Sequence, residues 1–366
     1  MPKVLIITDR QDAHARAVSD CLRKKGANPI RWFPEEFLFN QRSTQRINSN
    51  SYHSALYDDQ QFIDLLEIDT VWYRRAGLAR LLKKIDPFDY EFVENENRQF
   101  MKSLWLTLGE SAKWVNPYES FDKSNSKIFQ LREANRIGFS IPDTLVTNDR
   151  NCIINFFEEN QKSEIIYKTF FPANWQEDSG SFNLYTTRIS SEMVADDESM
   201  ALAPGIFQIA IQKQYEVRAT FFGKQCVAVQ IHNSEEIDWR VLQKDTKIKL
   251  NHITLPSELE KKCIYLMEKL GVVFGCFDFI VTPDGEYVFL EINEMGQFLW
   301  IEQLLPELHL LDLFCEFLLS DTNVVKEDEN IKQKTLMLDE IISSSSHDKL
   351  IEEDELIYEH FKKAVV

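Results

Sequence analysis

A hairpin pattern between Gly275 and Gln297 constrains the fold of this chain more than any other segment. Two apolar runs flank the dipeptide Asp284-Gly285, and Asp-Gly in that setting is a strong signal for a two-residue hairpin turn with positive φ at both positions. A turn centred there places Asp278 directly opposite Glu291. Asn293 lies two residues further along the same face. The sequence therefore predicts three oxygen-bearing side chains on one face of two antiparallel strands.

This arrangement of acids predicts a cation site. Two carboxylates that face each other inside an apolar hairpin repel unless a cation lies between them. Carboxylate and amide oxygens, without cysteine or histidine, are hard ligands that suit Mg²⁺ or Mn²⁺. For Asp278 or Glu291 taken singly, an ion pair with a neighbouring lysine or arginine is the alternative. The same-face placement of both acids and Asn293 favours a divalent metal.

Four basic residues in or beside apolar segments extend the pattern. Lys127 lies early in a predicted helix and Lys168 in a predicted strand. Arg218 shares a strand face with Glu216, and Arg240 lies in a predicted loop. Each has an ordinary alternative, either a solvated side chain or an internal ion pair. Taken with the hairpin, they supply the fixed cations that phosphoryl transfer requires, because that chemistry depends on positioning and charge neutralisation.

Length, charge and motif content bound the class of protein. The 366 residues predict two or three structural units, at roughly 100 to 200 residues per domain. The net charge of −18 opposes nonspecific binding to nucleic acid or anionic membranes. No GxxxxGK[ST] or GxGxxG motif occurs, which excludes a Walker-type phosphate loop and a dinucleotide-binding turn. Scattered cysteines, no signal-peptide pattern and no long apolar segment predict a reduced, cytoplasmic protein.

The order of apolar runs and helical patterns predicts an α/β unit followed by an α+β unit. Val4–Thr8 reads as a strand, a helix follows and ends at Gly26, and Ile63–Tyr73 reads as a second helix-to-strand segment. From Ile165 onward, runs of strands beside single helices indicate an α+β ligand-binding unit. Residues 326–366, with 11 acidic and 6 basic side chains, predict a loosely attached acidic appendage containing an amphipathic helix from Lys349 to Lys363.

Several of these segments resemble the ATP-grasp superfamily. Within it, the chain is similar to the peptide maturases that produce graspetides, the microviridin-type ligases, which are in turn similar to RimK-like glutamate ligases. The resemblance covers about residues 1–320 and leaves the tail unexplained. Its motifs are Val71-Trp72-Tyr73-Arg74-Arg75, Trp114-Val115-Asn116-Pro117, Lys127 to Gln130, Tyr215-Glu216-Val217-Arg218, Asp238-Trp239-Arg240, Glu291-Ile292-Asn293 and Gly296-Gln297-Phe298.

The resemblance implies an ATP-grasp fold and a role for each site residue. It divides the chain into an N-terminal pre-ATP-grasp α/β domain (1–120), a central subdomain (121–204), a C-terminal subdomain with the metal site (205–325) and the tail (326–366). The resemblance places a hinge between the subdomains at Gln208. Family members often have an acidic residue after this glutamine, and this chain has Ile209 there instead. The resemblance implies that Lys127 and Lys168 contact ATP, that the backbone of the hinge residues Gln208, Ile209, Ala210 and Ile211 binds adenine, and that Glu216 binds ribose. It implies that Arg218 and Arg240 bind the γ-phosphate or the acyl phosphate. Magnesium would be bound by Asp278, Glu291 and Asn293, of which Asn293 would also lie near ATP.

The activity implied by the resemblance is ADP-forming ligation through an acyl phosphate. A precursor peptide with a leader and an acidic core would supply a carboxylate, and a hydroxyl or amine of the same peptide would yield an ester or amide macrocycle. Arg74 and Arg75 are candidates to hold the acidic core, or else form a paired structural cluster. A RimK-like ligase that adds an amino acid and a regulatory nucleotide-binding module are the alternatives. A homodimer is an expectation from the family.

Overall fold

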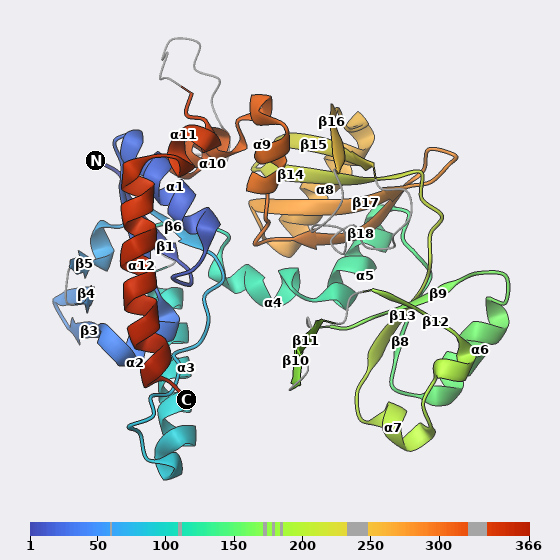
Figure 1. Cartoon of the computed structure of the whole chain (residues 1–366), viewed down its shortest axis with the longest axis horizontal. Helices are drawn as coiled ribbons and strands as arrows, with labels where there is room; N and C mark the ends of the chain where they lie inside the picture. The colour runs from blue at the N-terminus through green and yellow to red at the C-terminus, as the bar shows by residue number, and fades with distance from the viewer. Residues whose placement is uncertain are drawn as a thin grey trace.

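The computed structural model describes residues 1–58, 61–108, 112–170, 174–177, 180–183, 186–232, 248–320 and 335–366. Figure 1 shows an N-terminal lobe at the left, a large sheet at the upper right and a smaller lobe at the lower right. The chain returns at its end to the N-terminal lobe, so both termini lie there. In the described part of the chain, no helix has the length and apolar character needed to cross a membrane.

The N-terminal lobe is built on a parallel sheet, as the alternating pattern predicts. The helix α1 (Ala13–Lys24), capped by Asp12, packs on the face that carries Val4 and Ile6, and α3 (Tyr90–Leu108) packs on the face that carries Leu5 and Ile7. The apolar run of β1 is therefore buried on both sides. In sheet order, the strands are β2 (Asn28–Trp32), β1 (Lys3–Ile7), β6 (Thr70–Tyr73) and β7 (Lys113–Val115).

The predicted helix before β6 is wrong. Residues 62–67 form a short strand, β5 (Phe62–Asp64), and a single 3₁₀ turn, η2 (Leu65–Glu67). The alternation of Ile63 and Leu65 into the core gives the strand period, which the short apolar run does not distinguish from a helix. β5 joins a small antiparallel sheet with β3 (Gln41–Asn48) and β4 (Ser51–Asp58), preceded by α2 (Phe37–Asn40).

The smaller lobe contains an antiparallel sheet covered by α6 (Arg150–Glu159) and the short α7 (Asp197–Ala201). β13 pairs with both β8 and β9, so the division between subdomains falls after β13 and not before residue 205 as predicted. In sheet order, the strands are β12 (Thr187–Ile189), β9 (Ile165–Lys168), β13 (Gly205–Ile209) and β8 (Thr144–Thr147), and a separate pair consists of β10 (Asn174–Glu177) and β11 (Gly180–Asn183).

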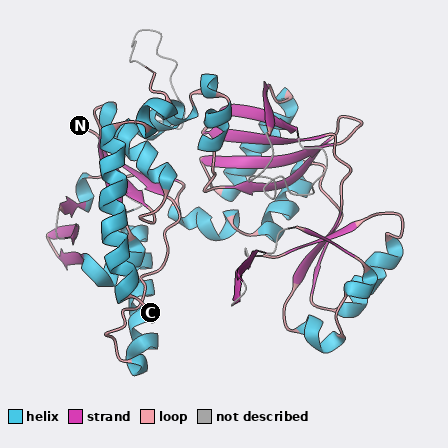
Figure 2. Ribbon diagram, viewed as in Figure 1, coloured by secondary structure: helices cyan, strands magenta, loops and turns pink. Residues whose placement is uncertain are grey.

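The large sheet is antiparallel throughout and carries the predicted hairpin at one edge (Figure 2). One face packs on α5 (Lys127–Ile137) and α8 (Ser257–Leu270), with Phe277 and Phe289 in the core. At one end of the other face, Phe274 packs among α9 (Leu299–Leu304) and α10 (Leu310–Leu319). In sheet order, the strands are β16 (Lys249–Ile253), β15 (Gln225–His232), β14 (Tyr215–Phe222), β17 (Phe274–Val281) and β18 (Tyr287–Asn293).

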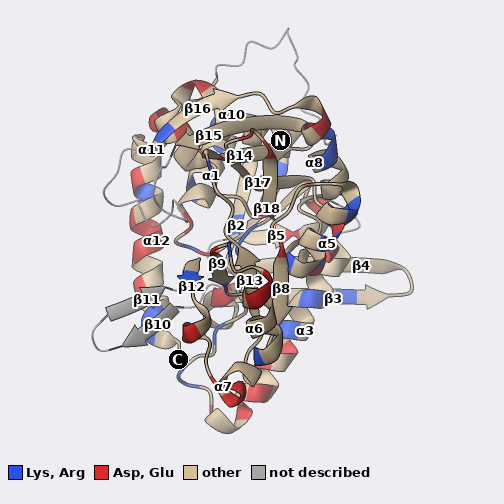
Figure 3. Ribbon diagram, turned by 90° about the vertical axis from the view of Figure 1, so that its right-hand side faces the viewer, with Lys and Arg blue, Asp and Glu red and all other residues tan. Residues whose placement is uncertain are grey.

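The C-terminal tail is docked on the N-terminal lobe. The loose attachment predicted from the composition of residues 326–366 is wrong for their described part, residues 335–366. Leu338 and Ile341 of α11 (Leu338–Ile342) are buried in the core that includes α1 and α10. The long helix α12 (Ser345–Ala364), which carries both acidic and basic residues, lies beside α1 (Figures 1 and 3). The predicted amphipathic helix is present, but the charge-rich composition did not reveal that its buried positions, His347, Asp354 and Phe361, pack against another lobe.

Candidate active site

The hairpin of β17 and β18 has the register predicted at its acids. Asp278 pairs with Glu291, and Cys276 pairs with Asn293. The turn itself differs from the prediction, because Gly285 N donates to Thr282 O at 2.9 Å and only Gly285, with a φ of 83°, has a positive φ there. The altered turn shifts the pairing near the hairpin tip by one residue, and an irregularity between Asp278 and Phe279 shifts it back.

Arg218 lies directly opposite Asp278 on the neighbouring strand β14. Its Nη1 donates to both carboxylate oxygens, at 2.8 and 2.7 Å, and its Nη2 donates to Gln297 O at 3.4 Å. Burial alone would lower the pKa of Arg218, but the charge of Asp278 and its hydrogen bonds, with Glu291 nearby, raise it above its ordinary value. The ion-pair alternative for Asp278 is therefore present in the structure.

The donor set at this site fits a hard divalent cation. Asp278, Glu291 and Asn293 present two carboxylates and an amide on one sheet face, and none of them is fully buried. Within the described ranges, no group of three or more histidine, cysteine, aspartate or glutamate side chains is placed to hold a metal. A Mg²⁺ ion bound here would take its remaining ligands from water and phosphate, as this ion commonly does.

The two predicted ATP-binding lysines come together between the lobes. Lys127 is the first residue of α5, whose N-cap Ser126 accepts from Phe129 N. Lys127 Nζ donates to Thr169 O at 3.1 Å, and Thr169 directly follows Lys168 at the end of β9. The two ammonium-bearing segments thus meet, although they are 41 positions apart in sequence.

The predicted hinge connects β13 to β14 and so joins the two sheets (Figure 1). Gln208 is buried, and its Nε2 donates to Thr144 Oγ1 at 2.8 Å. Ile209 N and Ala210 N donate to carbonyl oxygens of neighbouring segments. Ile211 N makes no backbone hydrogen bond with the described residues, which leaves this donor available to a ligand. Just after the hinge, Glu216 Oε1 accepts from Lys213 Nζ at 2.7 Å.

Arg74 forms the paired structural cluster that was the alternative to substrate binding. It is 0% exposed, and its Nε donates to Asp12 Oδ2 at 2.6 Å. Its Nη1 donates to Met295 O at 2.6 Å and to Gly296 O at 3.1 Å. Burial lowers the pKa of this guanidinium. Arg75, by contrast, is exposed and remains a candidate, whereas Arg240 lies outside the described residues.

His14 also contacts the chain that follows β18, a few residues beyond the contacts of Arg74. Its Nε2 accepts from Phe298 N at 3.3 Å and from Leu299 N at 3.2 Å, at the start of α9. Burial, together with the charge of Arg74, lowers the pKa of His14 to about 3. The neutral imidazole is the form that can accept both hydrogen bonds. The N-terminal lobe therefore fixes the chain that follows strand β18, which carries the predicted metal ligands Glu291 and Asn293.

Sequence reasoning assigned no role to two amides that hold β17 and β18 in place. Asn116 Nδ2 donates to Phe274 O at 2.8 Å and to Glu294 O at 2.9 Å, while its Oδ1 accepts from Phe274 N at 2.8 Å. Gln130 Oε1 accepts from Ile292 N at 2.9 Å. Both amides belong to motifs that carry the family resemblance.

The fold and this site define an ATP-grasp enzyme, and comparisons with known proteins agree. Residues 3–122 match the family model described as the MvdD pre-ATP grasp domain. The structure is similar to the macrocyclase MdnB of Microcystis aeruginosa, with 30% identity and a TM-score of 0.74, over 87% of this chain and 99% of that one. The chain therefore belongs to the ATP-grasp ligases associated with ribosomal peptides, as the sequence motifs predict.

Two further solved structures support the same assignment. A RiPP-associated ATP-grasp ligase of Chryseobacterium gregarium, in complex with ADP and a leader and core peptide, is 26% identical with a TM-score of 0.78, over 88% of this chain and 98% of that one. The macrocyclase MdnC of Microcystis aeruginosa, bound to its precursor peptide MdnA, is 25% identical with a TM-score of 0.76, over 87% and 100%. A comparison with curated sequences returns no match.

Proposed function

We propose that this ADP-forming ligase installs side-chain ester or amide crosslinks in a ribosomally made precursor peptide. The observation that carries the proposal is the apposition of Arg218 and Asp278, with Glu291 and Asn293 beside them, on the sheet face next to the hinge. This apposition occurs in a chain that is 30% identical to the macrocyclase MdnB over nearly all of that protein. A RimK-like ligase and a regulatory module would use the same nucleotide site, so the product must distinguish them.

ATP would bind between the two sheets. Lys127 and Lys168 supply positive charge for the phosphates, and the backbone N–H of Ile211, which has no acceptor among the described residues, is suited to an adenine nitrogen. Glu216 lies directly after the hinge, where its carboxylate can accept from ribose hydroxyls. Mg²⁺ or Mn²⁺ held by Asp278, Glu291 and Asn293 would neutralise phosphate charge and polarise the γ-phosphate.

The chemistry proceeds by two displacements. A carboxylate of the peptide attacks the γ-phosphorus of ATP, which gives an acyl phosphate and ADP. A hydroxyl or amine then attacks the acyl carbon, and inorganic phosphate leaves. When Asp278 turns toward a cation, the guanidinium of Arg218 becomes free to bind phosphate oxygens, and its Nε has no partner among the described residues. Arg240 is the second cation that we propose for this task.

The peptide partner would combine a leader with an acidic core. Support comes from the Chryseobacterium ligase and MdnC, whose structures contain peptides of this kind. Arg75 is exposed at the carboxyl end of β6, where ligands commonly bind in parallel sheets. We further propose that the enzyme works in the cytoplasm, where its six free cysteines stay reduced, and that it forms a homodimer.

An intact-mass assay tests the proposal. Purified protein, Mg-ATP and an acidic precursor peptide rich in Thr and Lys, such as the product of a neighbouring small gene, are incubated with free amino acids present. Stepwise loss of water from the peptide, abolished by Asp278→Asn and by Glu291→Gln, is the expected result. The exposed Glu286 in the hairpin turn provides a matched control, because Glu286→Gln removes the same charge outside the site.

Other outcomes of this assay would support one of the two alternative functions. A mass gain by whole residues would overturn crosslinking in favour of amino-acid ligation. Nucleotide binding without ADP release, across all peptides and amino acids offered, would support the regulatory alternative.

A further inference from the structure

The segment that follows β6 concentrates positive charge in an acidic protein. Residues 74–86 join β6 to the 3₁₀ turn η3 (Pro87–Asp89) without forming a helix or a regular strand, and residues 70–85 contain no aspartate or glutamate. Arg75, Arg80, Lys83 and Lys84 are all exposed. In a chain with a net charge of −18, these cations give this segment a local positive potential that attracts anionic ligands. We refer to residues 75–84 as the basic loop.

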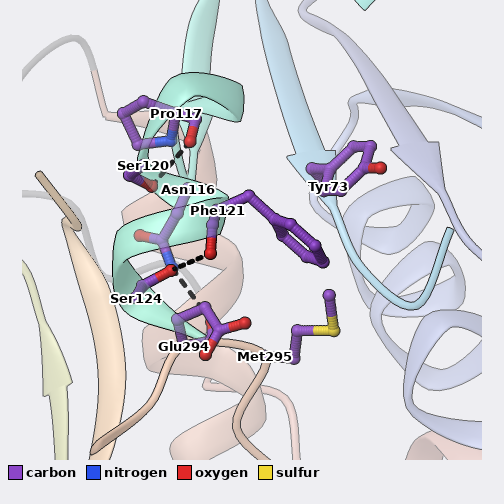
Figure 4. A pocket seen from close by; sticks show the side chains of 8 residues that line it. All are labelled: Tyr73, Asn116, Pro117, Ser120, Phe121, Ser124, Glu294 and Met295. Atoms are coloured by element: carbon purple, nitrogen blue, oxygen red, sulfur yellow. Dashed lines mark hydrogen bonds between the residues drawn. The ribbon is translucent and has the colours of Figure 1, made fainter. Parts of the chain in front are cut away.

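The basic loop begins beside the chain that carries the predicted metal ligands. Just before it, Tyr73 packs edge to face on Phe121 of the short helix α4 (Phe121–Ser124), with ring centroids 5.9 Å apart. Figure 4 shows both rings beside Met295, where they line a small pocket. Met295 is two residues beyond Asn293, and its carbonyl oxygen accepts from Arg74. A ligand that lies along the basic loop therefore approaches the candidate active site at the first residue of the loop.

The last residues of the chain hold the far end of the basic loop. Lys83 N donates to Ala364 O at 2.8 Å, and Val366 N donates to Leu81 O at 3.0 Å. The two bonds form a short antiparallel pairing between the loop and the tail. Figure 1 shows the C terminus beside α3, the helix to which this segment leads. The C-terminal tail thus contacts the basic loop directly as well as covering α1.

Buried side chains strengthen this attachment. Leu82, Phe361 and Val365 pack together and are each at most 4% exposed, and the Phe361 ring meets the Phe39 ring at 5.8 Å. A loop that only displays solvated charges needs no such attachment. Fixing Leu82 restricts the backbone beside the exposed cations, so less conformational entropy remains to be lost when a ligand binds them. The family resemblance ends near residue 320 and does not explain this tail.

The arrangement of the cations suits an extended acidic peptide. Arg75, Arg80, Lys83 and Lys84 are spread along ten residues of irregular backbone and so match carboxylates that are spread along an extended chain. The net charge of the whole protein opposes nucleic acid, whose dense phosphates would meet the acidic surface around the loop. A short acidic segment can contact the loop alone.

We propose that the C-terminal tail, through Phe361 and Val365, positions the basic loop to bind an acidic segment of the peptide substrate. This inference rests on the proposed function. The exposed cations of the loop contact the peptide. Phe361 and Val365 act through the loop backbone and are therefore positioning residues.

Peptide binding to the full chain tests the loop without requiring turnover. Fluorescence anisotropy compares a labelled peptide of alternating Glu and Thr with a matched peptide that has Gln in place of Glu. Arg80→Gln combined with Lys84→Gln should raise the Kd of the acidic peptide roughly threefold to thirtyfold, reduce its salt dependence and leave the Gln peptide unchanged. Lys349→Gln, which removes an exposed charge from α12, should bind as wild type does. Equal affinities of the double variant and wild type for the acidic peptide, or tighter binding of a labelled oligothymidine, would overturn the proposal.

Variants of Phe361 test the role of the tail. Phe361→Ala keeps every cation of the loop, yet it should raise the Kd of the acidic peptide by a similar factor and speed amide hydrogen exchange in residues 76–86. Phe361→Leu, which fills most of the same space, should restore both. If Phe361→Ala does not fold, a chain that ends at Ala364 provides the same test. Faster exchange in the loop with wild-type affinity for the acidic peptide would overturn the positioning role.

The two proposals can fail separately. If wild type converts no precursor peptide in the intact-mass assay, the proposed function fails, while the anisotropy titration still decides whether the basic loop binds an acidic peptide.

Discussion

Arg218 and Asp278 occupy directly opposed positions on β14 and β17, and Arg218 Nη1 donates to both oxygens of the carboxylate. Arg218 is only 6% exposed, so Asp278 is the counter-ion of its guanidinium in the absence of phosphate. The same aspartate is the residue that the hairpin register offers to a metal. One carboxylate thus has two alternative partners, and the choice between them would couple cation binding to release of the arginine.

Asp278→Asn should destabilise the protein as well as inactivate it. The substitution leaves a buried guanidinium without a counter-ion, and the loss of one partner from a buried pair lowers the free energy of unfolding by about 3–5 kcal/mol. Urea denaturation followed by circular dichroism measures the change. Asp284→Asn, the same substitution in the exposed turn, should stay within about 0.5 kcal/mol of wild type. An unchanged midpoint for Asp278→Asn would mean that the pair adds nothing to the fold.

Lys127→Met should weaken nucleotide binding while the fold is kept. Among the described residues Lys127 Nζ donates one hydrogen bond, to Thr169 O, and its side chain is half-buried where the two lysine segments meet. Loss of a charge-assisted contact to phosphate should raise the Kd for Mg-ADP about tenfold to hundredfold, measured by calorimetric titration. Lys123→Met on α4 removes an exposed charge nearby and should have no such effect. Equal affinities for the two variants would exclude Lys127 from the nucleotide site.

The lowered pKa of His14 predicts how the free energy of unfolding depends on pH. Its pKa is about 3 in the folded protein and about 6.5 when unfolded, so between these values the unfolded chain binds more protons. The stabilisation is complete above about pH 7 and is lost as the pH falls from 6.5 toward 3. Between pH 7.5 and 5.5, wild type should lose about 1.4 kcal/mol more unfolding free energy than His14→Gln, whose amide accepts a hydrogen bond without titrating. Parallel pH profiles would contradict the buried neutral imidazole.

Local patterns predicted the elements that carry the site. Glu216 and Arg218 share the strand β14 as predicted, and Lys127 lies early in a helix as predicted, because it is the first residue of α5. The pairing of Asp278 with Glu291 is also as predicted, although it depends on two compensating irregularities. Alternation and turn residues are short-range signals, so they determine which side chains share a strand face.

Contacts between lobes could not be predicted in this way. Arg74 Nη1 reaches Met295 O across 221 positions of sequence, and no local period encodes that partner. The small pocket beside Tyr73 combines residues from β6, α4 and the loop after β18, so it is visible only once the lobes are packed together. The same non-local packing made a buried structural residue of Arg74, whose sequence neighbour Arg75 stays exposed.

The docked tail supplies the last prediction, which concerns Asp354 of α12. This aspartate is 1% exposed, and its oxygens accept from Arg31 Nη1 at 2.6 Å and from Arg10 Nη1 at 3.2 Å. Asp354→Asn removes the charge that these two arginines of the N-terminal lobe share, so it should lower the free energy of unfolding by about 3–5 kcal/mol. Glu355→Gln, on the exposed side of the same helix, should change it by less than about 0.5 kcal/mol. If urea denaturation gives the same midpoint for both variants, α12 contributes nothing to the stability of the lobe it covers.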